Sequence, residues 1–437
     1  MTLAFAAPGA DDSMRGMLLG SIIGDALGTP VDTLGKGHIK AVFRTIEGYV
    51  DPEPALKNKM DRWKKPGLYS SLAQLMIVMA ACLAYGKKNG ISEFERALAD
   101  MPPVEGSAHA VVRGPGAAER YLLNCVRGQN ADAVRHAFPC ARPVAIIAPA
   151  VALCSRGAEW FTDAMRASLL FTSDITTAAA AVICAGLLRR LGGMAEARGD
   201  VDIVRVARDV ADAVRREAEE NPQCVFECAS NPDAFAVAAG RFAEIFGAVE
   251  SAAGLAGAES LICALAGRDM TNKAAHATVN HPLYVVPYAV FICARFGHDP
   301  AGALFAMVSE GGAAAASGCV AGSILGAAYG TGWIPDTLRE NLVNRKKLSA
   351  CIDSLIQGRA SFDMVRDFIA SEAPLTAKEM QERAAREKHN QPKRKKTPSG
   401  SEKERRLTQH VVESWTKLDR AKWKKERKKL DRRNDSE

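Results

Sequence analysis

Glycine recurs at every fourth position near the start of the chain, in the segment MRGMLLGSIIGDALGTPVD (14–32). Gly16, Gly20 and Gly24 therefore share one side of a helix, because residues four positions apart lie above one another on the helix surface. A face without side chains lets a second helix approach closely, and Gly28 then allows a sharp loop to follow. The segment predicts a helix that packs tightly against another helix.

The rest of the chain also carries the helical period, and strand signals are scarce. In LAQLMIVMAACLAYG (72–86), apolar residues such as Leu75, Val78 and Cys82 recur three or four positions apart, as they do on one face of a helix. Clusters of Gly and Pro separate such segments and mark the turns between them. We therefore predict one all-α domain from about residue 12 to 372. Further helical segments are expected at 174–191, 201–219, 233–248, 287–296 and 317–329.

Cysteine usage favours a reducing compartment. The chain has 11 cysteines, an odd number without CxxC spacing, which suits unpaired core thiols in a cytoplasmic protein. Cys224 and Cys228 form the one close pair in the sequence, but a zinc site would need two more ligands at matching spacing. The first residues lack the basic start of a signal peptide, and no uncharged apolar run reaches about twenty residues. We therefore expect no leader peptide and no membrane contact.

The composition changes abruptly toward the end of the chain. Residues 373–400 are charged and broken by prolines, which predicts a solvated linker. Residues 401–437 place apolar side chains such as Leu407 and Trp415 on one stripe, which predicts a basic amphipathic helix. Residues 378–437 hold 21 lysines and arginines against 11 aspartates and glutamates, so they carry all the positive excess of a chain whose net charge is +7. This tail predicts either weak contact with polyanions or a solvated helix that aids solubility.

The segment 14–32 resembles the opening motif of the ADP-ribosylglycohydrolase family, RGxLLGxAxGDALGxPxE. Later segments resemble further motifs of that family in the same order, and 307–330 is similar to VNxGGDTDTxGAIAGAxxGAxYG without a gap. The resemblance covers about residues 12–345 and implies an all-α, orthogonal multi-helix bundle. The other similar segments are 65–80, 140–153 and 170–188.

The resemblance also implies a metal site that this sequence no longer encodes. Members of the family hydrolyse a glycosidic bond at the ribose anomeric carbon with two Mg²⁺ ions, whose ligands come mainly from a Thr-Asp-Asp and an Asp-x-Asp-Thr/Ser motif. Mg²⁺ requires such hard oxygen donors, and none of these carboxylates remains, so no cofactor is expected. The Asn-Gly of the third motif is likewise replaced, by Ala141-Arg142. The degenerate metal positions are Ser70, Ser71 and Leu72 in the first ligand motif and Ala313, Ala314, Ala315 and Ala316 in the second.

A few residues keep the potential for chemistry or for ligand contact. Asp32 stands where several family members carry a catalytic or metal-linking Glu, so it is a candidate general base; the alternative is a turn Asp that accepts backbone hydrogen bonds. Asp25 is either structural or the second carboxylate of an acid–base pair. By the resemblance, Gly28, Gly311 and Gly312 are expected to lie at the ligand.

Three other residues give weaker signals. His276 and His281 are five positions apart and invite a metal interpretation, although a third ligand is missing and surface or capping roles are commoner. Arg113, in VVRGPG, is a candidate phosphate contact.

Three functions remain open on these grounds. The first is a catalytically impaired ADP-ribosylglycohydrolase-like protein, a pseudoenzyme, which binds ADP-ribose or an ADP-ribosylated partner. The second is an active hydrolase that uses the residual carboxylates. The third is a protein that binds polyanions or nucleic acid through its basic tail.

Overall fold

The computed structural model describes residues 9–57, 59–128, 137–155, 157, 159–194, 201–226, 231–268, 270 and 273–390. Over these residues the fold is all-α, which confirms the predicted class, and the one pairing of strand type is an isolated bridge between Gly35 and Gly311. The α-helices are α1 (Ala10–Gly28), α2 (Lys36–Phe43), α3 (Glu53–Leu56), α4 (Ser71–Gly86), α5 (Gly90–Ala99), α6 (Ala117–Val126), α7 (Ala141–Cys154), α8 (Glu159–Phe171), α9 (Ile175–Met194), α10 (Ile203–Glu220), α11 (Pro222–Phe226), α12 (Pro232–Glu250), α13 (Leu255–Ala266), α14 (Pro282–Arg295), α15 (Pro300–Ser309), α16 (Ala314–Tyr329), α17 (Asp336–Glu340), α18 (Arg345–Ile356) and α19 (Phe362–Asn390); short 3₁₀ turns lie at Thr29–Val31, Met60–Arg62 and Lys87–Asn89.

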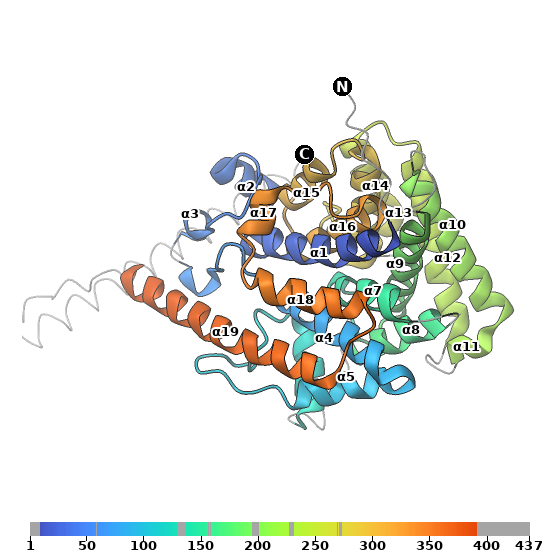
Figure 1. The fold of residues 1–437 in the computed structure, drawn as a ribbon. Coiled ribbons are helices and arrows are strands. Elements are labelled where there is room, and N and C mark those ends of the chain that lie inside the picture. The colour runs from blue at the N-terminus through green and yellow to red at the C-terminus, as the bar shows by residue number, and fades with distance from the viewer. Residues whose placement is uncertain are drawn as a thin grey trace, which may run out of the picture. The chain divides into compact units, whose positions relative to one another are not determined.

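Helices α1 and α16 form the closest pair in the bundle and run antiparallel through its middle (Figure 1). A Cβ atom on Gly20 would lie 2.2 Å from the carbonyl oxygen of Gly322, and one on Gly24 would lie 2.0 Å from that of Gly318. Real Cβ atoms essentially never come so close to backbone, so the two helices touch main chain to main chain. The glycine spacing therefore does what the sequence predicted: it removes side chains from a helix–helix contact.

Helix α9 is a core helix. It packs against α7, α8, α10, α12 and α16. By length and composition it is the one helix of the described ranges that could cross a membrane, yet 67% of its most apolar stretch is buried inside the bundle. Its apolar character is accounted for by neighbouring helices, as expected for the centre of an α-helical globule.

The end of the helical body differs from the sequence expectation. The residues expected to begin a linker at 373 instead continue α19 as far as Asn390, and the compact unit extends to Lys388. Glu372, Thr376 and Glu379 are buried. Their polar atoms bond to groups earlier in the chain, namely Arg113, the Val111 carbonyl oxygen and the Lys65 backbone N–H respectively. The remainder of the expected linker and the predicted helix at 401–437 lie outside the described residues.

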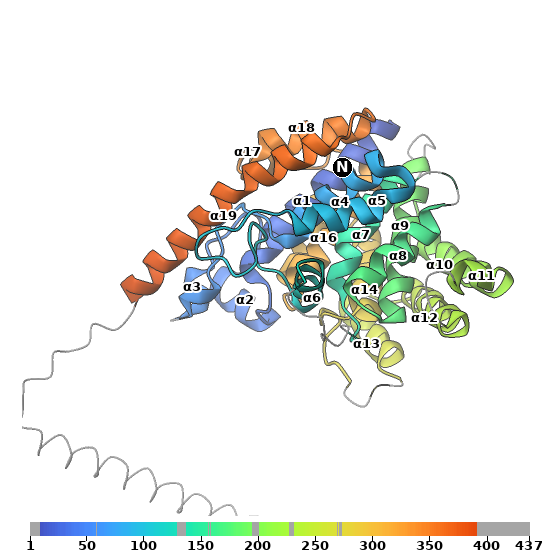
Figure 2. The same ribbon diagram turned by 90° about the horizontal axis from the view of Figure 1, so that it is seen from below.

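Helix α19 runs beside α18 along one edge of the bundle (Figure 2). Its anchor is an ion pair in which Arg113 Nη2 donates to Glu372 Oε2 at 2.5 Å, with both side chains at most 2% exposed. Tyr69 and Asn344 donate to the other oxygen of Glu372. Farther along the helix, Lys65 pairs with Glu382 at 2.8 Å. Several of the charges that suggested a solvated linker are therefore paired with the body of the protein.

Candidate functional site

The positions singled out by the motif resemblance meet at one end of the α1–α16 pair. The C-terminal end of α1 lies there with the N-terminal ends of α4, α7 and α16, which carry Asp25, Ser71, Arg142 and Ala315 respectively. Hydrogen bonds join the ends of α1, α4 and α7, and Asp32, which follows α1, joins them to the start of α16. The fold thus brings together segments that are far apart in the sequence.

Asp25 links α1 to the start of α4. Its Oδ2 accepts the backbone N–H groups of Ser70 at 2.8 Å and Ala73 at 3.1 Å, and its Oδ1 accepts the hydroxyls of Thr29 and Ser70, both at 2.7 Å. The carboxylate is fully buried. It caps α4 from outside that helix and helps to satisfy amides that have no partner within the helix. Both oxygens are occupied, so the structural role weighed for Asp25 is the one its contacts describe.

Asp32 plays a related part at the start of α16. Its Oδ1 accepts the backbone N–H of Ala315 at 3.2 Å, and its Oδ2 lies 3.9 Å from Nη1 of Arg142. Burial raises the pKa of Asp32, while Arg142 and the Ala315 amide partly offset the effect. Its side chain keeps 28% exposure, so Asp32 is the carboxylate of this site that solvent still reaches. Asp32 therefore caps the start of α16 and is also a titratable group that solvent can reach.

A buried arginine lies among these segments. Arg142, the second residue of α7, donates from Nε to Glu119 Oε1 at 2.6 Å and from Nη2 to Ser71 Oγ at 2.8 Å. Ser71 Oγ in turn donates to Glu119 Oε1 at 3.2 Å. Burial alone would lower the pKa of Arg142, but the carboxylates of Glu119 and Asp32 outweigh it and raise the pKa above its ordinary value. The guanidinium is therefore a permanent positive charge.

Sequence reasoning treated Arg142 only as an eroded motif position and did not find Glu119. The signal available in the sequence was the charged residue Arg142 in the third motif, together with the absence of carboxylates from the two metal-ligand motifs. A glycine makes room for the new pair, since a Cβ on Gly116 would lie 2.6 Å from Arg142 Nε and 2.7 Å from Glu119 Oε2. The local sequence RGPGAAE is thus shaped around the ion pair.

The residues present do not fit the two Mg²⁺ ions that the resemblance implies. The hydroxyls of Ser70 and Ser71 are already engaged, with Asp25 and with Glu119 and Arg142. Leu72, Ala313, Ala314, Ala315 and Ala316 offer no side-chain oxygen. A guanidinium adjoins these positions and repels a second cation. Across the described ranges, no group of three or more His, Cys, Asp or Glu side chains is placed to hold a metal.

The three glycines expected at a ligand each lie against protein backbone. A Cβ on Gly28 would meet the Ala314 carbonyl oxygen at 2.2 Å, one on Gly311 the Leu34 oxygen at 2.3 Å, and one on Gly312 the Thr278 oxygen at 2.3 Å. Gly311 and Gly312 have positive φ, 74° and 64°, which a residue with a side chain rarely adopts. They shape the turn that brings the start of α16 to Asp32.

Lys64 lies at the edge of this site and was not found from the sequence. Its ammonium has no hydrogen bond or ion pair within the described part of the chain. Burial lowers the pKa of Lys64, and Glu379 of α19 partly offsets this, with smaller effects from Arg142 and Asp32. A Cβ on Gly114 would lie 2.9 Å from Lys64 Nζ. Lys64 therefore lies near both the Asp32–Arg142 pair and α19.

The weaker candidates have local roles. His281 accepts the backbone N–H of Leu283 through Nδ1 at 3.2 Å and so caps α14, and burial lowers its pKa to about 4. The His276 side chain is 71% exposed and lies 3.4 Å from Glu259. Arg113 is engaged with Glu372 rather than exposed to a phosphate. No metal site or phosphate contact is built from these residues.

Comparison with known proteins agrees with this architecture. The family model of the ADP-ribosylglycohydrolases matches residues 6–363. A solved structure titled "ADP-ribosylglycohydrolase-related protein complex" superposes with a TM-score of 0.52 at 20% sequence identity, and the match covers 80% of this chain and 99% of that one. No curated protein matches. Almost all of α19 lies beyond the family match.

Proposed function

Because this chain belongs to the ADP-ribosylglycohydrolase family, we propose that it is a catalytically impaired member that binds ADP-ribose or an ADP-ribosylated protein without cleaving it. The observation that carries the proposal is the buried Arg142 guanidinium, paired with Glu119 and 3.9 Å from Asp32. It adjoins the positions where the family motifs would hold metal ligands. A fixed cation within the protein takes over the charge balance that a bound cation would supply.

The electrostatics disfavour metal-dependent hydrolysis here. A unit charge 4 Å from another interacts by about 4 kcal/mol at an effective dielectric constant of 20, and a divalent ion beside Arg142 would meet about twice that repulsion. Serine hydroxyls and alanine methyl groups offer no compensating negative charge. We therefore derive no reaction step through Mg²⁺ in this protein.

An active, metal-free hydrolase is the second candidate, and the hydrogen bonding disfavours it. Glycosidic hydrolysis without metal ordinarily needs one carboxyl group as acid and another as base or nucleophile. Asp25 has both oxygens occupied by four donors. Asp32 retains exposure and a raised pKa but has no second free carboxylate of this site beside it.

Binding of an anionic nucleotide is supported by the positive groups that remain. The N-terminal ends of α4, α7 and α16 lie around Arg142 and Asp32, and helix N-termini favour phosphate groups. Asp25 and Asp32 cap the starts of α4 and α16, so α7 is the helix among the three whose start neither aspartate caps. Lys64 adds an ammonium without a hydrogen-bonded partner among the described residues. ADP-ribose carries a diphosphate whose charges suit these groups. We place the protein in the cytoplasm, because buried core cysteines such as Cys82, Cys184 and Cys293 are unpaired thiols.

The decisive experiment measures binding and turnover on the full-length chain. ADP-ribose is titrated calorimetrically with and without millimolar Mg²⁺, and release of ADP-ribose from ADP-ribosyl-arginine and ADP-ribosyl-serine peptides is followed. We expect binding that does not depend on Mg²⁺, no turnover above buffer, and no Mg²⁺-dependent rise in melting temperature.

Two variants sharpen this experiment. Lys64→Met should weaken ADP-ribose binding by about tenfold, the value of one charge-assisted hydrogen bond, whereas Lys59→Met, at an exposed lysine nearby, should not. Release of ADP-ribose by the parent chain that disappears in Asp32→Asn would overturn the proposal that the protein is catalytically impaired. A melting temperature that climbs with Mg²⁺ concentration would show that metal ligands exist elsewhere.

A further inference from the structure

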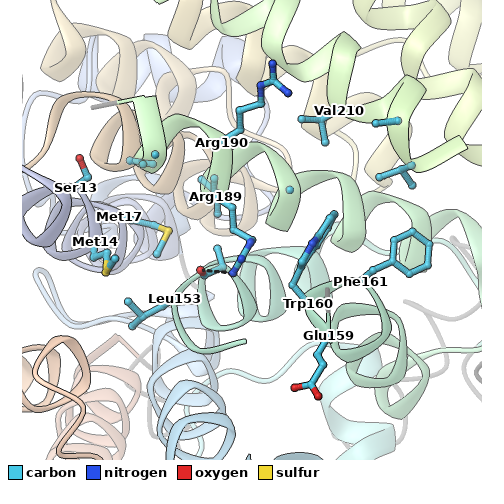
Figure 3. Close-up of a pocket in the computed structure, with 18 of the residues that line it drawn as sticks. Ser13, Met14, Met17, Leu153, Glu159, Trp160, Phe161, Arg189, Arg190 and Val210 are labelled. Atoms are coloured by element: carbon cyan, nitrogen blue, oxygen red, sulfur yellow. Dashed lines mark hydrogen bonds between the residues drawn. The ribbon is translucent and has the colours of Figure 1, made fainter. Parts of the chain in front are cut away.

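A large cavity lies at the opposite ends of the helices that form the candidate site (Figure 3). Its volume is about 980 Å³. Leu153 lines it eleven residues along α7 from Arg142, which is roughly 16 Å at 1.5 Å per residue. Ala327 lines it twelve residues along α16 from Ala315, or roughly 18 Å. The cavity is therefore separate from the site described above.

The walls are mainly apolar and include a flat aromatic surface. Trp160 and Phe161 of α8 face it together with Met17 of α1 and Val210 of α10. The Trp160 ring lies close over α9, because a Cβ on Gly186 would come within 3.0 Å of its Cη2. An aromatic side chain fixed in this way offers a planar face of large contact area.

Two arginines of α9 line the cavity, Arg189 and Arg190, and Arg189 is the one that lies beside that surface. In Figure 3, Arg189 lies between Leu153 and Trp160. Its Nη1 donates to the Ser155 carbonyl oxygen at 2.7 Å, which fixes the guanidinium at the end of α7 and leaves Nε and Nη2 without a partner among the described residues. The carboxylate of Glu159 points away from Arg189 in the same view.

A buried hydroxyl in the wall lacks a partner among the described residues. Ser13 is 1% exposed, and its hydroxyl has no hydrogen-bond partner within the described part of the chain. Unsatisfied buried hydroxyls are rare, since each costs about 1–3 kcal/mol. Arg189 therefore offers donors to an occupant of the cavity, and Ser13 adds a buried hydroxyl without a described partner in the wall.

We propose that this cavity binds an organic anion with a flat apolar body, stacked on Trp160 with its acidic group at Arg189. The volume suits a ligand of drug-like size. In such apolar pockets a small number of polar groups fixes the orientation of the ligand. A neutral apolar molecule would leave the guanidinium desolvated without a counter-charge, which is unfavourable.

The test uses 8-anilinonaphthalene-1-sulfonate, a flat aromatic anion, and N-phenyl-1-naphthylamine, which lacks the sulfonate. Binding to the full-length chain is followed by dye fluorescence and by energy transfer from tryptophan. We expect one saturable site for the sulfonate dye. Arg189→Met should weaken it by about tenfold to a hundredfold, the range for a hydrogen-bonded charge, and leave the neutral dye nearly unaffected.

The controls separate this site from other causes. Arg205→Gln removes an exposed positive charge from α10 and should change neither dye. Trp160→Leu should weaken both dyes and reduce the energy transfer to the part that the other four tryptophans supply. This variant replaces Arg189→Met as the test if Arg189→Met does not unfold cooperatively. Absence of saturable sulfonate binding, or equal loss of both dyes in Arg189→Met, would overturn the proposal. The proposed function is tested by ADP-ribose binding in Lys64→Met, a residue outside this cavity, so failure here leaves the proposed function intact.

Discussion

Arg142 donates from Nε to Oε1 of Glu119 at 2.6 Å, and the two side chains are 9% and 0% exposed. The pair joins the start of α7 to α6, and it adjoins the residues that the family motifs would use for metal. Burying two charges is unfavourable unless they are paired and hydrogen-bonded. The stability of the fold therefore depends on keeping both Arg142 and Glu119.

Neutralising one partner should expose that dependence. Glu119→Gln leaves the guanidinium buried without its main counter-charge, and we expect a loss of about 3 kcal/mol in the free energy of unfolding. The double variant Glu119→Gln/Arg142→Met should recover part of the loss, because neither charge is then left alone. Urea denaturation of the four proteins of the cycle measures the coupling.

An exposed pair provides the control for this cycle. Arg215 and Glu219 are also an Arg–Glu pair, with a separation of 3.0 Å, but their side chains are 37% and 48% exposed. Glu219→Gln should therefore cost less than about 1 kcal/mol. Equal effects at Glu119 and Glu219 would show that burial does not govern the pair.

The raised pKa of Asp32 predicts a pH-dependent effect of Asp32→Asn. A carboxyl group whose pKa is raised in the folded state contributes stability below its unfolded pKa and loses it as pH rises through the folded pKa. The Asn variant should therefore gain melting temperature relative to the parent between pH 4 and pH 7. A gain that shrinks with rising pH would reverse the sign we assign.

The main-chain contact between α1 and α16 predicts strong sensitivity to one methyl group. In Gly20→Ala the new Cβ would lie 2.2 Å from the Gly322 oxygen, so the helices must separate, at a cost of about 3 kcal/mol. Gly37, on the exposed side of α2, has no neighbouring atom within 4 Å of a new Cβ. Gly37→Ala should instead add up to about 1 kcal/mol. Thermal unfolding distinguishes the two, and equal shifts would contradict the close contact.

The buried Arg113–Glu372 pair predicts that α19 is part of the folded body. A chain truncated after Ser361 loses Glu372 and leaves Arg113 buried without its counter-charge, so we expect it to aggregate or to lose cooperative unfolding. A chain truncated after Asn390 keeps the pair and should retain the melting temperature of the full-length protein. Equal melting temperatures of the two truncated chains would show that α19 is dispensable.

The charge of the tail predicts weak, salt-sensitive polyanion binding. The full-length chain should be retarded on duplex DNA at low salt and released as salt rises, because counterion release drives such binding. The chain truncated after Asn390 should show no retardation. Retardation that persists in about half-molar salt would point to sequence-specific contacts instead.

Local pattern determined much of the architecture from the sequence. The glycines at 16, 20 and 24 predicted a tight helix pair, because a four-residue spacing places them on one helix face whatever lies opposite. The apolar period predicted an all-α body for the same reason. The linker expected from residue 373 was misplaced, because polar composition cannot tell a solvated helix from one whose charges are paired across the fold, as Glu372 is with Arg113.

At the candidate site, residue identities could be read from the sequence, but the contacts between remote residues could not. The sequence by itself determined that metal-ligand carboxylates are absent at 70–72 and 313–316, since that is a matter of residue identity. Only the folded structure decided what stands there instead, because Arg142, Glu119 and Asp32 are separated by up to 110 positions and meet through packing of α6, α7 and α16. Charge balance in a buried site depends on distance, and distance between remote residues is set by the tertiary fold.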